Sequence, residues 1–415
     1  MKKVLMVAYH YPPFGGGSGI HRTLKFSRYL SEYGWQPIVL TISPHAYPLR
    51  EKAQHSVPAG VVTARAFALD TARHLSFRGA YPQWMAIPDR WVTWWPSAVG
   101  IGTSLIRKHR PQAIWSTFPI ATAHMIGLAL HRVSGLPWVA DFRDPMVEVD
   151  PITGEEFPRD PLVRKVSSWI EERTVKFCSR AVFTTPGTLA MYANRFREIP
   201  DTQWTVIANG YDEEDFTAAE RQVDARKLPE KPVVLLHSGV LYPFERDPMA
   251  FFQALAEMRR SGNISPSTLK VILRATGHDE YYRAPLRDLG IADIVSLEPT
   301  ISHDQAVAEM LKVHGLLIFQ ATNSNRQIPA KAYECLRAGR PIFAMTDPAG
   351  DTASLLRAEG IESIVPLDSK NDIADGLVKF LSTLDSSHDH ARRSVERHSR
   401  KAKTRELAAL LDSFQ

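Results

Sequence analysis

The chain has 415 residues, more than one hydrophobic core usually supports, so we expect two domains. Its apolar fraction of 44% and charged fraction of 23% are those of an ordinary globular protein, and a net charge of +5 is too small to indicate a nucleic-acid partner. This mild positive charge suits a phosphate-bearing ligand or an anionic membrane surface. Cys178 and Cys335 are far apart, which argues against a disulfide framework or a cysteine zinc site and fits a reducing cytosol.

The N-terminal residues MKKVLMVAYHYPP begin with basic residues, but their apolar run is short. They lack a longer apolar core and a small-residue cleavage site, so we interpret Val4–Ala8 as a buried first strand and not as a signal peptide. No run of about 18 apolar residues occurs anywhere in the chain, so no transmembrane helix is predicted. We expect a cytoplasmic protein, at most peripheral on the membrane face.

A glycine-rich loop, residues 15–19, follows the first strand and leads into a helix that starts near Ile20 and is followed by a strand over Pro37–Ile42. This β-loop-α-β order predicts a Rossmann-like domain. Glycines allow close backbone approach, and a helix N-terminus attracts anions, so Gly16 and Gly17 are candidate phosphate contacts. The dinucleotide spacing fails because Ile20 stands at the third glycine position. The alternative is a loop needed only for the turn.

Residues 44–110 are rich in proline and less regular. Within them, residues 84–95 combine four tryptophans with an arginine. Such a cluster could sit at lipid headgroups or line a pocket for a hydrophobic acceptor. Packing beneath a long loop is the commoner outcome and is our preferred interpretation.

The segment DFRDP follows a predicted strand at Trp138–Ala140. Ligands bind at the carboxyl ends of strands in open α/β sheets, so Asp141, Arg143 and Asp144 are candidate site residues. They could equally form an internal ion pair that fixes the loop. Further strands and helices of this half are expected at 113–116, 121–130, 162–177, 181–184 and 204–207.

The polar segment 213–231 reads as a linker, and strand-helix alternation resumes at residue 232. We therefore predict an α/β fold with two Rossmann-like domains, residues 1–212 and 232–390, facing across a ligand cleft. Residues 391–415 carry a basic run followed by apolar residues at helical spacing, which predicts an amphipathic terminal helix. Its basic face is expected to be solvated, with contact to anionic lipid as the alternative.

A short helix over Ala330–Ala338 is predicted to end at Gly339 and to lead into a buried strand. It contains one carboxylate, Glu334, among mainly apolar neighbours. Near the carboxyl edge of a sheet, this carboxylate is well placed to accept hydrogen bonds from ribose hydroxyls. The alternative is an ordinary solvent-facing glutamate.

Five motifs in order resemble the nucleotide-sugar-dependent glycosyltransferases of GT-B fold, particularly family four and its capsule and lipopolysaccharide members. They are YPPFGGGSGIHR, VADFRDP, IANGYDEEDF, HSGVLYPFERDP and PAKAYECLRAGRPIFA, and together they extend over nearly the whole chain. The resemblance implies a donor nucleotide held mainly by the C-terminal domain and an acceptor held mainly by the N-terminal one. It also implies that the final helix crosses back onto the first domain.

By position, the resemblance implies that Glu334 binds the donor ribose, and that Lys331 and Arg246 neutralise the leaving diphosphate. Many relatives carry a second glutamate eight residues earlier, where this chain has Arg326, and this departure affects sugar recognition. The implied donor site comprises Gly16, Gly17, Gly239, Arg246, Arg326, Gln327, Ile328, Lys331 and Glu334.

The resemblance further implies sugar transfer with retention of configuration and without a metal or other cofactor, consistent with the lack of an Asp-x-Asp motif. The implied catalytic residues are Arg246 and Lys331 at the leaving group, and Asp141 or Asp144 at the acceptor hydroxyl. The expected partners are a nucleotide sugar and a glycan or lipid-linked acceptor for cell-surface polysaccharide, with weak contact to anionic membrane. Two alternatives remain: a sugar-nucleotide 2-epimerase, and a non-catalytic subunit of a polysaccharide assembly complex.

Overall fold

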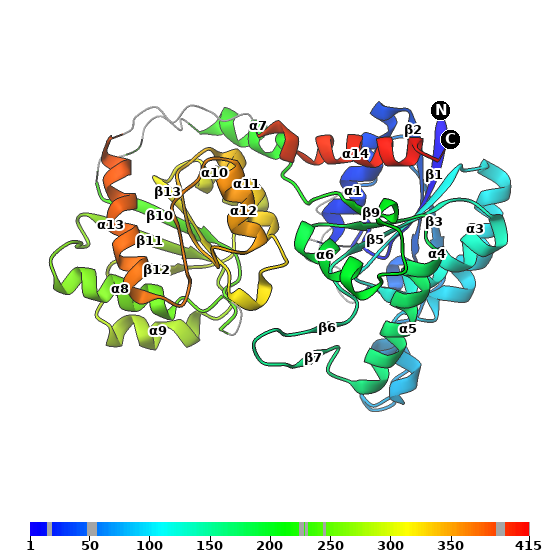
Figure 1. Cartoon of the computed structure of the whole chain (residues 1–415), viewed down its shortest axis with the longest axis horizontal. Coiled ribbons are helices and arrows are strands. Elements are labelled where there is room, and N and C mark those ends of the chain that lie inside the picture. Colours follow the sequence, from blue (N-terminus) through cyan, green and yellow to red (C-terminus); the bar gives the residue numbers. More distant parts are fainter. Residues whose placement is uncertain are drawn as a thin grey trace. The chain divides into compact units, whose positions relative to one another are not determined.

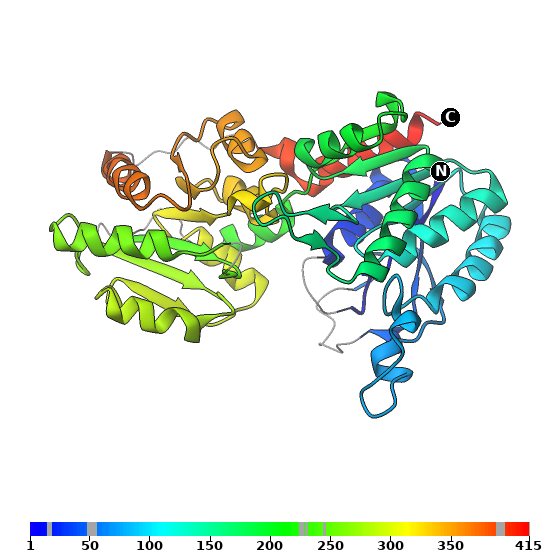
Figure 2. The same ribbon diagram turned by 60° about the horizontal axis from the view of Figure 1, so that its bottom comes forward.

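In the computed structural model, the described residues are 1–14, 19–47, 56–223, 228, 231–243, 246–386 and 395–414. The chain forms two compact units (Figures 1 and 2). Unit 1 comprises Met1–Ala208 and Arg400–Gln415, and unit 2 comprises Asn209–Ser399. Gly16 and Gly17 lie outside the described residues, so the glycine-loop prediction stays a prediction.

Unit 1 is built on a seven-stranded sheet with the order β3-β2-β1-β4-β5-β8-β9, and all its strand pairs are parallel. The order reverses between β1 and β4, where a doubly wound sheet opens at its carboxyl edge. The central strand β1 is buried from Val4 to Val7, as expected for a strand covered on both faces. The strands are β1 (Lys2–Val7), β2 (Trp35–Ile42), β3 (Val62–Ala66), β4 (Ala113–Thr117), β5 (Trp138–Arg143), β8 (Arg180–Phe183) and β9 (Trp204–Val206).

Helices of unit 1 surround this sheet (Figure 2). The C-terminal helix α14 (Arg400–Asp412) belongs to unit 1, where it packs on α1 (Gly19–Tyr29) and buries Leu407 and Leu411. A two-stranded antiparallel sheet, β6 (Glu148–Val149) with β7 (Glu156–Phe157), follows β5. The other helices are α2 (Thr71–His74), α3 (Trp94–His109), α4 (Ala121–Ser134), α5 (Pro161–Phe177) and α6 (Pro186–Arg195), with 3-10 turns at Leu30–Tyr33, Pro44–Ala46, Gln83–Ala86 and Asp201–Gln203.

Unit 2 has a six-stranded parallel sheet with the order β12-β11-β10-β13-β14-β15, the classic doubly wound order. The order reverses between β10 and β13. The strands are β10 (Val233–Ser238), β11 (Leu269–Arg274), β12 (Val295–Glu298), β13 (Gly315–Phe319), β14 (Ile342–Met345) and β15 (Ile364–Val365). The helices are α7 (Glu213–Gln222), α8 (Met249–Arg260), α9 (Asp279–Asp288), α10 (His303–Met310), α11 (Ala330–Ala338), α12 (Asp351–Ala358) and α13 (Lys370–Ser386), with 3-10 turns at Thr322–Ser324 and Glu396–His398.

The predicted α/β fold with two Rossmann-like domains is confirmed. The expected linker differs, because its first ten residues form α7. Asp212 caps this helix, and three acidic residues in its first turn favour the helix dipole. Phe216 and Ala219 are buried at i and i+3, so α7 is an amphipathic part of unit 2 and not a solvated connection.

The irregular reading of residues 44–110 is also incomplete, because the segment contains β3 and the 16-residue α3. Its tryptophans have different environments. Trp94 is fully buried and Trp91 is half-buried, as the packing interpretation requires, whereas Trp84 is 70% exposed. The interpretation therefore holds for only part of the cluster.

Candidate functional site

The carboxyl edge of the unit 2 sheet brings together the ends of β10 and β13, on either side of the switch point. His237 lies near the end of β10, and Gly239 follows the strand with φ of +150°, a region that favours glycine. The Gly239 amide donates to the Arg274 carbonyl of β11 at 3.0 Å. The chain thus leaves regular strand geometry at the carboxyl edge of the sheet, where ligands bind in open α/β folds.

His237 is a candidate that motif reading missed. Its Nδ1 lies 3.0 Å from the carbonyl of Leu317, and because a carbonyl only accepts, Nδ1 carries the proton. Burial, together with the positive charges of Arg246 and Lys331, lowers the pKa of His237 to about 4. The ring is therefore neutral at pH 7. Its buried Nε2 is an acceptor that finds no hydrogen-bond donor in the described part of the chain.

Arg246 lies in the loop after β10. Its amide donates to the Tyr242 carbonyl at 2.8 Å, and its guanidinium lies 5.9 Å from the centroid of the Tyr242 ring. The positive charges of Arg246 and Lys331, from different segments of unit 2, both contribute to the lowered pKa of His237.

Lys331 and Glu334 stand one turn apart on α11, with Nζ 2.7 Å from Oε2. Glu334 is 9% exposed, so the surface-glutamate alternative is wrong. The helix begins without a side-chain cap and without an acidic residue in its first turn. The positive charge of Lys331 in the first turn opposes the positive N-terminal end of the helix dipole. An anionic ligand would interact favourably with the lysine and with the helix N-terminus. The local charge therefore favours an anion at the start of α11.

The loop between β13 and α11 is held from inside by Gln320, which is 2% exposed. Its Nε2 donates to the carbonyls of Ser324 at 2.7 Å and Gln327 at 2.8 Å. The side chains of Arg326 and Gln327 are exposed, and Ile328 is half-buried. Gln320 thus fixes the backbone of the predicted donor loop while leaving its side chains at the surface. Sequence reasoning missed this residue because a glutamine after a buried strand carries no motif.

Asp141, at the end of β5 in unit 1, is saturated by internal partners. Arg22 donates from Nε to Oδ2 at 2.8 Å and from Nη2 to Oδ1 at 2.7 Å, and the Thr117 hydroxyl donates to Oδ2 at 2.9 Å. Both Asp141 and Arg22 are buried. The ion-pair alternative therefore describes Asp141, although its partner is Arg22 of α1 and not the neighbouring Arg143.

Asp144 has a different environment from Asp141. Within the described residues, no group donates a hydrogen bond to its carboxylate. Burial raises the pKa of Asp144, against the opposing charge of Arg143. A register shift between Asp141 and Arg143 marks a bulge in the β5–β8 pairing, and Arg143 has φ of +60°. Bulges occur often next to sites, and this one immediately precedes Asp144.

Among the described residues, no group of three or more His, Cys, Asp or Glu side chains could hold a metal ion. None of the described helices is both long and apolar enough to cross a bilayer. Cys178 and Cys335 are free and buried.

No protein-family model matches the chain, and no curated protein matches it. Solved structures do resemble it over the full length. Sucrose-phosphate synthase from Thermosynechococcus elongatus has 15% identity and a TM-score of 0.62, covering 100% of this chain and 96% of that one. The lipopolysaccharide outer core galactosyltransferase WaaB has 14% identity and a TM-score of 0.64, covering 99% of each chain. Anabaena HepE, solved with UDP and glucose, has 14% identity and a TM-score of 0.59, covering 100% of each chain.

Identities this low establish a shared fold and nothing finer. The chain has the fold of these proteins, with two Rossmann-like units and a C-terminal helix that belongs to the first unit. This is the GT-B fold that the sequence motifs predict.

Proposed function

We propose that this chain is a glycosyltransferase that moves a sugar from a nucleotide-diphosphate sugar to a glycan or lipid-linked acceptor. The observation that carries the proposal is the charge arrangement in unit 2, where Lys331 and Arg246 lie near one strand end and Glu334 stands one turn behind Lys331. The names of the structural neighbours, a galactosyltransferase and a protein solved with UDP and glucose, support the same class of substrate.

In the proposed donor complex, the diphosphate lies at the uncapped start of α11 and takes Lys331 as a counter-ion. Glu334 then exchanges its ion pair with Lys331 for hydrogen bonds from the ribose hydroxyls. Arg246 provides further positive charge as negative charge builds up on the leaving diphosphate. Gly239, Arg326, Gln327 and Ile328 complete the unit 2 part of the proposed site, and Gly16 and Gly17 are the proposed phosphate contacts of unit 1.

For the acceptor, the two aspartates of unit 1 take different roles. Asp144 has a raised pKa and an unoccupied carboxylate, which suits a group that orients or deprotonates a hydroxyl. Asp141 is committed to Arg22 and acts by holding the strand end in place. We propose transfer with retention of configuration and without a metal, in a family-four enzyme of cell-surface polysaccharide synthesis on the cytoplasmic side of the membrane.

A donor-panel assay tests the proposal. Purified protein is incubated with each common nucleotide sugar, with and without a lipid-linked or glycan acceptor, and free nucleoside diphosphate is measured. Release that depends on the acceptor is expected, and the anomeric configuration of the product tests retention. Interconversion of two nucleotide sugars without an acceptor would instead identify a 2-epimerase. Absence of both reactions together with absence of nucleotide binding would contradict the proposal.

A further inference from the structure

The two most exposed aromatic residues in the described part of the chain, Phe77 and Trp84, lie seven positions apart in unit 1. They are 77% and 70% exposed. Both belong to the segment between β3 and α3, which forms a projection at the lower right of Figure 1. Exposing large aromatic side chains to water is unfavourable in free energy, so two of them in one short segment indicate a binding surface.

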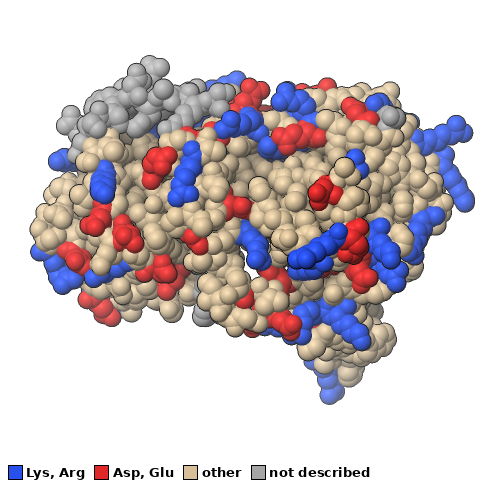
Figure 3. Space-filling model, in the orientation of Figure 1, with Lys and Arg blue, Asp and Glu red and all other residues tan. Residues whose placement is uncertain are grey.

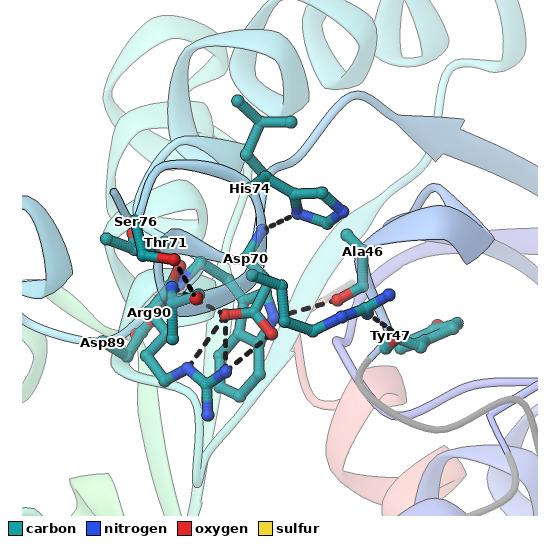
Figure 4. Close-up of polar contacts among 12 residues, drawn as sticks. Ala46, Tyr47, Asp70, Thr71, His74, Ser76, Asp89 and Arg90 are labelled. Atoms are coloured by element: carbon teal, nitrogen blue, oxygen red, sulfur yellow. Dashed lines mark hydrogen bonds and ion pairs between the residues drawn. The ribbon is translucent and has the colours of Figure 1, made fainter. Parts of the chain in front are cut away.

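The projection is held by a buried polar frame centred on Asp70, which is completely buried. Arg90 donates to its carboxylate from Nε at 2.9 Å and from Nη2 at 2.8 Å (Figure 4). The Thr71 hydroxyl contacts the carbonyls of Met85 and Arg90 at 2.9 and 3.0 Å. These bonds tie the two ends of the projection together, so its aromatic residues are presented on a fixed support.

Phe77 stands at a tight turn. Its amide donates to the Ala80 carbonyl at 2.8 Å, and the Ala80 amide donates back to the Phe77 carbonyl at 3.1 Å. The two central residues, Arg78 and Gly79, have φ of +52° and +81°, as in a type I′ turn. The Arg78 guanidinium lies 5.5 Å from the centroid of the Phe77 ring. The turn thus places an aromatic ring and a cation together at its tip.

The exposed charge of the projection is positive. Arg73 and Arg78 are exposed, whereas its two acidic residues point inward. Asp70 is paired with Arg90, and Asp89 accepts hydrogen bonds from the Thr122 amide and hydroxyl, each at 2.8 Å. Lys and Arg side chains are visible on the lower-right projection in Figure 3.

Helix α5 also exposes apolar and basic side chains. Its first turn adjoins the projection through a hydrogen bond from Gln83 to Asp160, the cap of α5. Leu162 and Trp169, each 49% exposed, lie on one face because they are seven residues apart, and the exposed Lys165 lies between them. This face is mainly apolar and basic, with one exposed acid, Glu172, a turn after Trp169. Apolar and basic residues are combined on helices that lie on anionic membranes.

We propose that the projection and this face of α5 bind the surface of an anionic lipid bilayer, with Phe77 and Trp84 entering the headgroup region and Arg73, Arg78 and Lys165 contacting lipid phosphates. Charge complementarity favours lipid over another protein surface, because the exposed Arg73 and Arg78 make the projection positive and lie beside exposed aromatic rings. This proposed membrane contact lies at the projection and α5, and not at the terminal helix or at the packed tryptophans of the cluster. Trp91 and Trp94 are engaged in packing, and the terminal helix α14 is packed on α1. The proposed membrane binding does not depend on the proposed sugar transfer.

Vesicle sedimentation of the full chain tests this inference. We expect the protein to sediment with phosphatidylglycerol–phosphatidylcholine vesicles at low salt and much less with phosphatidylcholine alone. The double variant Phe77→Ala/Trp84→Ala should lower the partition coefficient about tenfold or more, because burial of two large aromatic side chains is lost. Arg73→Gln/Arg78→Gln should remove most of the salt dependence. Tyr281→Ala, an aromatic residue 55% exposed in unit 2, is the matched control and should bind as the parent does.

Thermal unfolding separates these effects from misfolding. All four positions are exposed, and Arg73 donates one hydrogen bond, to the Tyr47 carbonyl, so the melting temperature should change little. Failure of the parent to bind anionic vesicles, or equal binding by the double variant and the control, would overturn the inference. So would a dimer in light scattering that the double variant dissociates while no vesicle binding occurs, because the surface would then join two copies of the chain. The donor-panel assay reads sugar transfer separately, so the two proposals can fail independently.

Discussion

Arg22 and Asp141 form a bidentate ion pair inside unit 1, between α1 and the end of β5. The same guanidinium donates to the carbonyls of Ile207 at 2.9 Å and Ala208 at 3.2 Å, where the chain leaves unit 1. One side chain therefore connects the helix after the glycine-rich loop, the strand that leads to Asp144, and the last residues of the unit. This network gives Asp141 a structural role.

Asp141→Ala should lower the free energy of unfolding by about 3–5 kcal/mol, because it leaves the Arg22 charge buried without its partner. Urea denaturation of the isolated chain measures this change. Asp144→Ala is the matched control, three residues away and without a hydrogen-bond donor among the described groups, and it should cost much less. Equal losses for the two variants would contradict the assignment of Asp141 to the interior network.

Glu334→Ala should weaken nucleotide-sugar binding by about 1–3 kcal/mol, the scale of losing hydrogen bonds to a polar ligand. Isothermal titration calorimetry with the donor identified by the panel measures the effect. Glu280→Ala, an exposed glutamate of α9 in the same unit, serves as the control and should bind the donor normally. An unchanged affinity of the Glu334 variant would remove this residue from the donor site.

Arg246→Ala should lower kcat more than it weakens acceptor binding, because positive charge at the leaving diphosphate matters most as the bond breaks. Steady-state kinetics with both substrates varied would separate kcat from the two KM values. Arg283→Ala, an exposed arginine of α9, is a suitable control. A variant that turns over at the parental rate would refute the phosphate role of Arg246.

The α11 prediction succeeded for a local reason: its apolar positions, its length and Gly339 at its end are all written in adjacent residues. The Arg22–Asp141 pair could not be read in this way, because its members are 119 positions apart and only the fold brings them together. Helix α7 was missed because its charged residues resemble a linker, although Asp212 and the spacing of Phe216 and Ala219 were a usable signal. The tryptophans of residues 84–95 differ in burial because burial depends on tertiary packing, which composition does not encode.

The His303–Asp215 pair, with Nε2 3.0 Å from Oδ2, should make the stability of the protein depend on pH. The hydrogen bond that His303 donates to the Asp215 carboxylate raises the pKa of His303. A raised folded-state pKa means that this stabilisation is fully present below the ordinary histidine pKa of about 6.5 and is lost as pH rises through the folded value. Asp215→Asn should therefore flatten the pH dependence of the melting temperature above about pH 6. Asp304→Asn, the exposed acid next to His303, should leave the slope intact; an unchanged slope in Asp215→Asn would contradict the linkage.

Asp144→Asn should abolish most sugar transfer while leaving nucleotide-sugar affinity unchanged, because the variant keeps the shape of the side chain and removes its basicity. Loss of general base catalysis typically costs about 100-fold to 10,000-fold in rate. Burial raises the pKa of the Asp144 carboxyl, so the parental kcat should fall as pH decreases through that raised pKa, since only the ionised form accepts a proton. The acidic limb of the pH–rate profile should disappear in Asp144→Asn. Asp150→Asn, on the nearby β6–β7 connection, controls for a general loss of negative charge in unit 1 and should keep the acidic limb. If Asp144→Asn keeps both the parental rate and the acidic limb, another group accepts the proton and Asp144 has no catalytic role.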